Sequence, residues 1–492
     1  MSMYDIAIIG AGVSGASIAW QLSHYDLQTI LLESEADVCF GVSKANSGIV
    51  HGGFHHALKT LKAKLEIRGS LMFERLQHDL GFPFQRCGIL VVALRDEDMS
   101  VVRRLFEQGR ANGVQGLEVC GRERILSLEP GLNPEVVGGL YAPNGGTVEP
   151  YRYVFSLVES AIRNGVNLRC NCRIRRGIHE SGAWTLLADD GTEIRARHVV
   201  NAAGLHADEV SRCCGAEEYE IHPRKGEEYL LDRRAACRPR HVIFPVPSPH
   251  SKGMLVIPTA GGTTMIGPTA DTVPEKGDTV TTTAAMDTIF EQAGHLVQGV
   301  SRRDLIASFA GNRPVLDSED FFIATSEKVP HFIHVAGIQS PGLTASPAIG
   351  EYVKDLLKGD GVQMIEKAVF EYDLPRRRSA RDLSFAELDA LHAEDPSWTR
   401  IICRCERVSE AEIVEAVRHG HTTLDGVKFY TRAGMGRCQG GFCSARILKI
   451  ISRESGIPLE ELTKKGGNSR ILVGKLGDLE VRGEGLEVKG ER

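Results

Sequence analysis

An excess of basic residues is the first thing this chain lacks. Its 492 residues include 58 Lys and Arg against 64 Asp and Glu, a formal net charge of −6 at pH 7. Proteins that bind nucleic acid carry a strongly basic face that neutralises phosphate groups. The charge balance therefore argues against a nucleic-acid partner.

Long hydrophobic runs are also missing. A membrane-spanning helix needs a run of roughly 18 or more apolar residues, and the chain has no such run. Glycines interrupt the apolar segment near the N-terminus, IAIIGAGVSGASIAW. We therefore expect neither a signal peptide nor a transmembrane segment of the chain's own. The expected location is the cytoplasm, with any membrane contact made through a partner subunit.

Cysteines are too sparse for a disulfide scaffold, because only 12 occur in the whole chain. In a protein without an export signal these thiols are expected to stay reduced. Four of them nevertheless fall close together near the C-terminus, at Cys403, Cys405, Cys438 and Cys443. Clustered cysteines in a reduced protein favour metal binding or catalysis.

A dinucleotide-binding motif begins the chain. An apolar strand from Asp5 is followed by Gly10, Gly12 and Gly15 in a GxGxxG pattern, and then by a helical apolar stripe. The glycines allow a tight turn and close approach of a pyrophosphate, and the helix N-terminus supplies amide donors. A second strand, QTILLE, ends in Glu33, whose carboxylate suits the ribose hydroxyls. The motif alone does not separate FAD from NAD.

Further segments follow in an order that resembles a known superfamily. They are GVSKANSGIVHGG (41–53), RKGEEYLL (224–231), VIPTAGGTTMIGPTA (256–270), GNRPVLD (311–317) and GIQSPGLTASPAIGEYV (337–353). The chain is similar over roughly residues 3–360 to the flavin-dependent amine and hydroxy-acid oxidoreductases that include D-amino-acid oxidase. Within them it resembles the branch of L-2-hydroxyglutarate dehydrogenase and FAD-dependent glycerol-3-phosphate dehydrogenase.

The resemblance implies an α/β fold for residues 1–370. Its Rossmann-type FAD-binding domain would be assembled from about 1–80, 145–215 and 330–365, and the intervening segments would form a discontinuous α+β substrate domain. No second GxGxxG follows a strand, which argues against flavin reductases with a separate nicotinamide domain.

The same resemblance implies a set of FAD-binding residues beyond the first motif. A helix expected to start near Ser346 would place amide donors at the electron-rich edge of the flavin ring. The full set of FAD-binding residues that the resemblance implies is Ser47, Gly48, Gly204, Gly342, Leu343 and Thr344.

Two residues are expected to act on substrate. Arg313 matches the arginine of a G-x-R-P stretch that reaches the substrate's anionic group in the family, where a planar guanidinium suits a phosphate or carboxylate. The alternative is a surface arginine in an exposed turn. His51 matches a histidine beside the flavin in the family. Such a histidine can take the hydroxyl proton of the substrate or can have only a structural role. In some relatives the matching histidine is covalently tied to the flavin. His55 and His56 lie close by and are not ranked.

The C-terminal cysteines resemble an iron–sulfur domain. Two short helices are expected, one with a capping box at Ser409 and Glu412 and one starting at Cys443. The pattern TRAGMGRCQGGFC is similar to the [2Fe–2S] domain of bacterioferritin-associated ferredoxins, in the version fused to the catalytic subunit of anaerobic glycerol-3-phosphate dehydrogenases. Four cysteines also suit zinc, although C-x-C strains a single tetrahedral ion.

The remaining segments complete the expected organisation. Residues 371–398 are charged and mixed and are interpreted as a linker, 399–458 as the small helical [2Fe–2S] domain, and 459–492 as a tail. The tail is rich in glycine and charge with alternating apolar positions, a pattern that suits a hairpin or a frayed end.

The combined expectation is an FAD-dependent dehydrogenase that oxidises sn-glycerol 3-phosphate to dihydroxyacetone phosphate. Its cluster would pass electrons to electron-accepting protein subunits that lead to a membrane quinone pool. Three alternatives stay open: a dehydrogenase of L-2-hydroxyglutarate or another 2-hydroxy acid, an amine or opine dehydrogenase, and a non-catalytic carrier of electrons with flavin and cluster.

Overall fold

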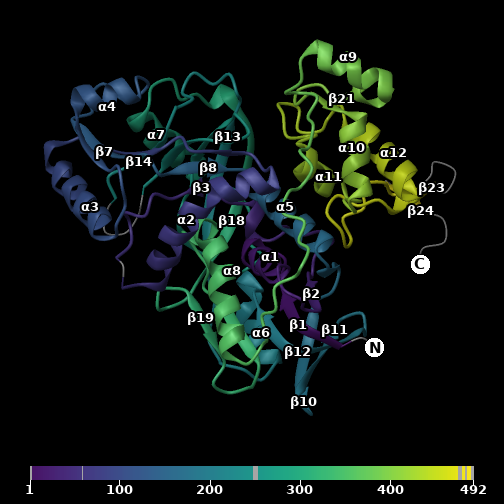
Figure 1. Cartoon of the computed structure of the whole chain (residues 1–492). Helices are drawn as coiled ribbons and strands as arrows, with labels where there is room; N and C mark the ends of the chain where they lie inside the picture. The colour runs from purple at the N-terminus through teal and green to yellow at the C-terminus, as the bar shows by residue number, and fades with distance from the viewer. Residues whose placement is uncertain (1–2, 58, 248–252, 475–478, 483–484, 489–492) are drawn as a thin grey trace. The chain divides into compact units, whose positions relative to one another are not determined.

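The computed structural model describes residues 3–57, 59–247, 253–474, 479–482 and 485–488 (Figure 1). The chain forms two compact units. The first comprises the residues up to Ser34 and from Val38 to Arg376, and the second comprises Glu35–Asp37 and the residues from Arg377 onward. The segment 371–398, expected as a linker, is thus divided between the two units at residue 376.

The first unit contains an eight-stranded sheet, here called the first sheet, in the order β10-β11-β12-β1-β2-β9, with β20 beside β12 and β19 beside β20. The strand β1 pairs in parallel with both β12 and β2, and β12 pairs in parallel with β20. The sequence predicted the β1-turn-helix-β2 order, which is confirmed. The strands are β1 (Met3–Ile9), β2 (Thr29–Leu32), β9 (Asn167–Arg169), β10 (Ile174–Glu180), β11 (Ala183–Ala188), β12 (Glu193–Asn201), β19 (Phe322–Thr325) and β20 (Phe332–Ala336).

Four helices pack together beside this sheet. The helix α1 (Val13–Leu22) contacts both α5 (Pro150–Arg163) and α8 (Gly342–Gly359), and α2 (Leu61–Leu80) contacts α8. The α2–α8 contact is very close, because a Cβ at Gly69 would lie 2.1 Å from the Thr344 carbonyl oxygen. The helix α8 begins at Gly342, four residues before the expected start near Ser346, so Gly342, Leu343 and Thr344 form its first turn.

A nine-stranded sheet, here called the second sheet, follows the order β17-β13-β16-β15-β14-β5-β7-β6, with β18 beside β13. Most of its pairs are antiparallel, and β5–β14 is parallel. The strands are β5 (Ile89–Ala93), β6 (Glu118–Gly121), β7 (Gly138–Ala142), β13 (His222–Leu231), β14 (Val242–Pro245), β15 (Leu255–Pro258), β16 (Thr264–Gly267), β17 (Asp271–Thr272) and β18 (Leu305–Val315).

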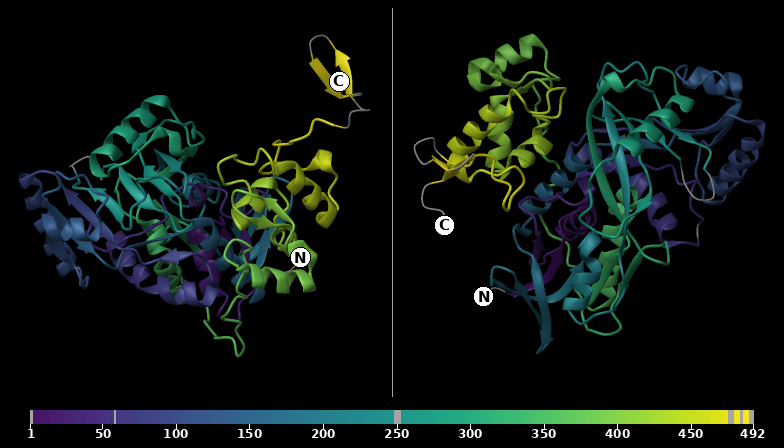
Figure 2. Two further views of the ribbon diagram at one scale, coloured as in Figure 1. Left: turned by 90° about the horizontal axis from the view of Figure 1, so that it is seen from above. Right: turned by 180° about the vertical axis from the view of Figure 1, so that it is seen from behind.

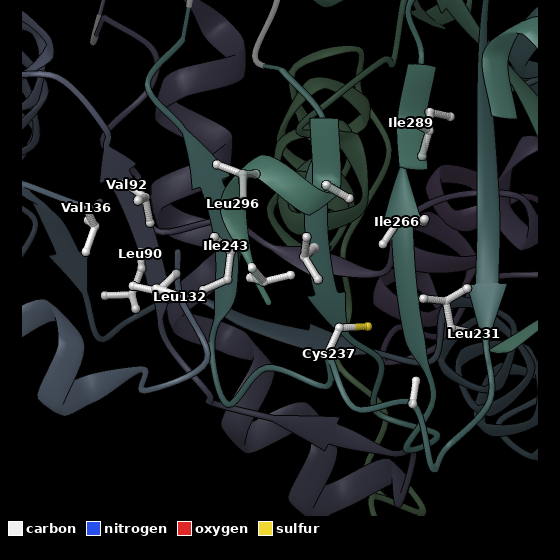
Figure 3. Close-up of a cluster of buried hydrophobic side chains, with 14 of the residues drawn as sticks. Leu90, Val92, Leu132, Val136, Leu231, Cys237, Ile243, Ile266, Ile289 and Leu296 are labelled. Carbon is white, nitrogen blue, oxygen red and sulfur yellow. The ribbon is translucent and has the colours of Figure 1, made fainter. Parts of the chain in front are cut away.

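The two faces of the second sheet are covered by different residues, because successive side chains of a strand point to opposite faces. On one face, Leu90, Ile243 and Ile266 pack against Ile289 and Leu296 of α7 (Thr283–Leu296) (Figure 3). On the other, their neighbours along the strands pack around Phe54 and α3 (Met99–Ala111). A small sheet of β3 (Ile49–Val50), β8 (Gly146–Val148) and β4 (Phe84–Gln85) completes the unit.

The second unit is mainly helical. It contains α9 (Phe385–Glu394), α10 (Glu410–Arg418), α11 (Leu424–Thr431) and α12 (Ser444–Ser455), with short strands β21 (Ile401–Cys403) and β22 (Val408–Ser409). The helices α10 and α12 pack side by side (Figure 2). Both were predicted, and the capping box forms as expected, with the Ser409 hydroxyl 2.8 Å from Glu412 Oε2. The helix α11 was not predicted.

The tail contains a hairpin of β23 (Leu479–Arg482) and β24 (Gly485–Val488), the first of the two expected forms. Its beginning belongs to the second unit, since the Leu424 amide donates to the Thr463 carbonyl at 3.1 Å. Among the described residues, none of the helices has the length and apolar character that crossing a membrane requires.

Candidate active site and metal centre

The glycine-rich turn after β1 packs tightly against the end of β12. Gly10 has φ +104°, and a Cβ there would lie 2.5 Å from the Ala202 carbonyl oxygen. A Cβ at Gly15 would lie 1.8 Å from the Gly10 carbonyl oxygen, so α1 reaches the turn only because position 15 has no side chain. Gly12 is the N-cap of α1 and faces the Ser43 hydroxyl. The turn thus has the form that the sequence predicts for a pyrophosphate site.

Glu33 lies at the end of β2, beside this turn. Its side chain is buried, and Oε2 accepts a hydrogen bond from the Ala11 amide at 2.8 Å. The carboxylate is therefore held at the glycine turn, where a nucleotide ribose is expected. Gly204, in a 3-10 turn that follows β12, has φ +57°, and a Cβ there would meet nothing within 4 Å.

The segment from Ser47 to His51 contains β3 and contacts the first turn of α8. The His51 amide donates to Thr344 Oγ1 at 3.0 Å, and the Thr344 hydroxyl donates to the Ile49 carbonyl at 3.2 Å. On the imidazole, Nε2 lies 3.3 Å from Ser340 Oγ. Gly48 has φ +67° and packs on the Val148 carbonyl. The predicted residues of this segment and of the first turn of α8 therefore meet.

The three neighbouring histidines have different surroundings. His56 Nδ1 lies 3.0 Å from the buried carboxylate of Glu66, an ion-pair geometry. His55 packs on the Phe244 ring, with centroids 5.3 Å apart. The backbone of His51 contacts the first turn of α8, and its ring contacts the loop before that helix. The expectation that His51 lies beside the flavin stays a prediction.

Arg313 lies within β18. The alternative interpretation from the sequence, a surface arginine in an exposed turn, is therefore wrong. Its Nη1 donates to the Thr269 carbonyl at 3.2 Å, and a Cβ at Gly226 would lie 2.5 Å from Nη2. The guanidinium thus lies flat over Gly226 on the adjacent strand β13. Burial lowers the pKa of Arg313, and the nearby Glu228 carboxylate opposes that shift.

Glu228 is the site residue that sequence reasoning missed. It shares one face of β13 with Gly226, because the two positions differ by two. The Ser47 hydroxyl donates to Oε1 of Glu228, while Oε2 is buried without a hydrogen-bond partner in the described part of the chain. Burial raises the pKa of this carboxyl to about 7, against the effects of Ser47 and Arg313. Side chains two positions apart on a strand point to the same face, so the alternation along β13 from Gly226 was the signal that could have identified Glu228.

The four C-terminal cysteines converge. The sulfur atoms of Cys403 and Cys405 are 4.0 Å apart, and those of Cys405 and Cys438 are 3.7 Å apart. The pKa of the Cys403 thiol is raised, mainly by its hydrogen bond with Cys443 and also by burial. These separations match those between thiolates bound to one metal ion, for which metal–sulfur bonds are about 2.3 Å. Metal binding removes the thiol protons.

A glycine-rich loop makes this convergence possible. A Cβ at Gly436 would lie 2.7 Å from the Cys405 Cβ, so position 436 must lack a side chain. Cys443 is the N-cap of α12, and Cys403 ends β21. The four sulfur atoms thus come from two loops held by secondary structure, and the donor set fits an iron–sulfur cluster.

Comparison with known proteins identifies both parts. The profile of the family described as FAD dependent oxidoreductase matches residues 5–356. The chain belongs to this family. The profile of the BFD-like [2Fe-2S] binding domain matches residues 401–453. The oxidoreductase therefore uses FAD and a [2Fe–2S] cluster, and zinc is set aside. The glycine turn and the first turn of α8 are the elements that fit FAD.

Named relatives of this oxidoreductase are similar over most of its length. A glycerol 3-phosphate dehydrogenase from Caloramator mitchellensis is 40% identical over 96% of this chain and 98% of its own. Subunit A1 of an anaerobic glycerol-3-phosphate dehydrogenase from Haloferax volcanii is 24% identical over 92% of this chain and 83% of its own. The structure of dithionite-reduced L-alpha-glycerophosphate oxidase from Mycoplasma pneumoniae with FAD bound has a TM-score of 0.73 at 29% identity, covering 76% of this chain and all of that one.

Proposed function

We propose that this oxidoreductase oxidises sn-glycerol 3-phosphate to dihydroxyacetone phosphate and passes the electrons singly through its cluster to a partner protein. The observation that carries the substrate class is Arg313, a guanidinium held over Gly226 within a strand and accompanied by the buried carboxyl of Glu228. Such a buried cation suits an anionic group held by two parallel hydrogen bonds. The names of the Caloramator and Mycoplasma relatives support glycerol 3-phosphate as that anion.

The roles of the residues follow from their positions. Arg313 binds the substrate phosphate, and His51, through Nε2, takes the proton of the secondary hydroxyl as the C2 hydride leaves. FAD, when bound, supplies the two-electron acceptor for that hydride. The amides of the first turn of α8 would favour negative charge on a flavin held beside them. The Ser340 hydroxyl lies 3.3 Å from His51 Nε2, so the substrate hydroxyl would replace it at that nitrogen.

The cluster gives the proposed division of labour. A [2Fe–2S] centre held by Cys403, Cys405, Cys438 and Cys443 would supply a one-electron carrier beside the two-electron flavin. The Haloferax relative is named as a subunit, which supports a separate acceptor protein for this chain. A membrane quinone pool beyond that acceptor belongs to the same proposal.

Anaerobic bleaching of the flavin tests this function. The expected result is rapid reduction by sn-glycerol 3-phosphate, with much slower reduction by L-2-hydroxyglutarate, sarcosine or an opine. Faster bleaching by L-2-hydroxyglutarate would transfer the proposal to the 2-hydroxy acids. A protein that binds FAD but is bleached by no member of the panel would be the non-catalytic carrier.

The Glu228 carboxyl is expected to set the alkaline limit of activity. Its pKa of about 7 lies above the ordinary carboxyl value, so it is protonated below that pH and ionised above it. An ionised Glu228 would pair with Arg313 and repel an anionic substrate. We expect kcat/KM to fall by about tenfold for each pH unit well above the pKa, because the protonated fraction falls by that factor.

The variant Glu228→Gln separates this effect from other titrations. It keeps a neutral hydrogen-bonding group, so the alkaline fall in kcat/KM should disappear. Glu275→Gln, an exposed change elsewhere in the first unit, should retain it. A Glu228→Gln enzyme with the wild-type alkaline limb would remove Glu228 from the substrate site.

A further inference from the structure

The surface around the cluster ligands carries cationic charge. Five exposed basic side chains adjoin the four cysteines in sequence, and we call them the cationic rim: Arg404, Arg407, Arg437, Arg446 and Lys449. Within 402–408 and 436–449 the one acidic residue is Glu406, which is buried and lies 3.0 Å from Arg432 Nε. The rim is thus a positive area on a chain whose formal net charge is −6.

An apolar side chain is exposed at the same place. Phe442, next to the ligand Cys443, is 87% exposed. Cys405 is also exposed, so a sulfur ligand of the cluster reaches the surface beside the rim. Isolated exposed apolar residues are common. Here, however, the phenylalanine lies in the loop between two ligands, where an electron would leave the protein.

The exposed basic residues of the cationic rim could have the alternative role of balancing the negative charge of the cluster, but their exposure does not suit that role. A buried arginine would serve that purpose best, since exposed charges are screened by water. The buried arginine of this segment, Arg432, is paired with Glu406. The rim side chains are exposed, which suits attraction of a partner during diffusional encounter.

We propose that the cationic rim and Phe442 form the docking surface for the electron acceptor, and that this acceptor is an acidic one-electron redox protein. The inference rests on the proposed function, because it assumes that electrons leave through the cluster. Each docking event transfers one electron from the reduced cluster to the acceptor, so two acceptor molecules are reduced for each substrate oxidised. Phe442 would occupy an apolar contact at the centre of the interface.

Binding of a probe protein tests the surface without turnover. The probe is the acidic soluble domain of cytochrome b5, titrated into the oxidised holoenzyme by calorimetry, with basic cytochrome c as counter-probe. We expect the acidic probe to bind more tightly, with an affinity that falls as salt rises. The double change Arg404→Glu with Arg446→Glu should weaken this binding by about tenfold or more and flatten the salt dependence.

Matched variants control for folding and for total charge. Lys465→Glu with Arg470→Glu changes the net charge equally at exposed positions after α12 and should leave probe binding within about twofold, because screening confines the effect of distant charges. Phe442→Ser should weaken binding with the salt dependence unchanged. Equal weakening in both double variants, or none in either, would overturn the docking proposal, as would tighter binding of cytochrome c than of the acidic probe.

A kinetic measurement separates the rim from internal electron transfer. In stopped-flow experiments without acceptor, reduction of flavin and cluster by sn-glycerol 3-phosphate should be the same in the rim variant and the wild type. Slower cluster reduction in the variant would assign the rim to the internal step and overturn the proposal. Failure of glycerol 3-phosphate to reduce the wild type would contradict the proposed function alone, because the probe titration needs no substrate.

Discussion

Exchanging Arg313 for lysine is expected to cut kcat/KM for the anionic substrate by roughly ten- to more than a hundredfold. Lysine keeps the charge and loses the planar fork, and each charge-assisted hydrogen bond not recovered costs about 1.5–3 kcal/mol. About 1.4 kcal/mol corresponds to one decade in rate. The position amplifies the loss, because the guanidinium lies against Gly226 and a lysine ammonium cannot fill that flat space in the same way.

The loss should be confined to substrate binding and catalysis. FAD content should stay at the wild-type level, since the dinucleotide is expected to be held by the Gly10–Gly15 turn and Glu33. Arg302→Lys is a suitable control, because Arg302 is exposed and pairs with Asp287 at 2.6 Å. Wild-type kinetics in the Arg313→Lys enzyme would exclude Arg313 from the anion site and weaken the argument for an anionic substrate.

Loss of the metal centre should separate the two halves of the reaction. In Cys438→Ser a cluster ligand is replaced, so iron and the cluster's EPR signal should disappear. If the cluster is the proposed one-electron relay, turnover with a protein acceptor should fall by roughly two decades or more. Anaerobic bleaching of the flavin by substrate should persist, since hydride transfer uses the first unit alone.

A second cysteine provides the control for this experiment. Cys213→Ser changes a thiol of α6 (Ala207–Cys213), in the first unit and outside the cluster loops, and should keep iron, FAD and turnover. The relay would be contradicted if Cys438→Ser abolished bleaching in a folded protein that still binds FAD. It would also be contradicted by full turnover with the protein acceptor in the absence of the cluster.

Several local elements were predictable because their signals are short in range. The glycine turn with its flanking strand and helix, and the capping box at Ser409, involve residues a few positions apart. Such patterns depend on backbone conformation and nearby hydrogen bonds, which a local sequence specifies. The start of α8 was placed too late because Pro341, the N-cap, has no side-chain cap to mark it.

The composition of the substrate site was much less accessible to sequence reasoning. Arg313 and Ser47 were singled out separately, yet Glu228 connects them, and it comes from a strand far from both in sequence. Its contact with Ser47 spans 181 positions. No local pattern encodes such a distance, because it depends on how β13 pairs with β18 and on which face of the sheet the segment 45–47 covers.

The sequence by itself determined the family resemblance and the two cofactors, and it pointed to four cysteines as candidate ligands, because closely spaced glycines and cysteines impose their chemistry on a local backbone. Tertiary structure alone decided that His51 contacts α8 and that the carboxyl of Glu228 accompanies Arg313. In the antiparallel pairing of β13 with β18, Gly226 lies opposite Gly311. A Cβ at Gly311 would lie 2.1 Å from the Ala45 carbonyl oxygen. These absent side chains let the segment before Ser47 and the guanidinium of Arg313 approach Glu228. A shift of one residue in either strand would turn Glu228 or Arg313 to the opposite face, which is why pairing and packing had to decide the site.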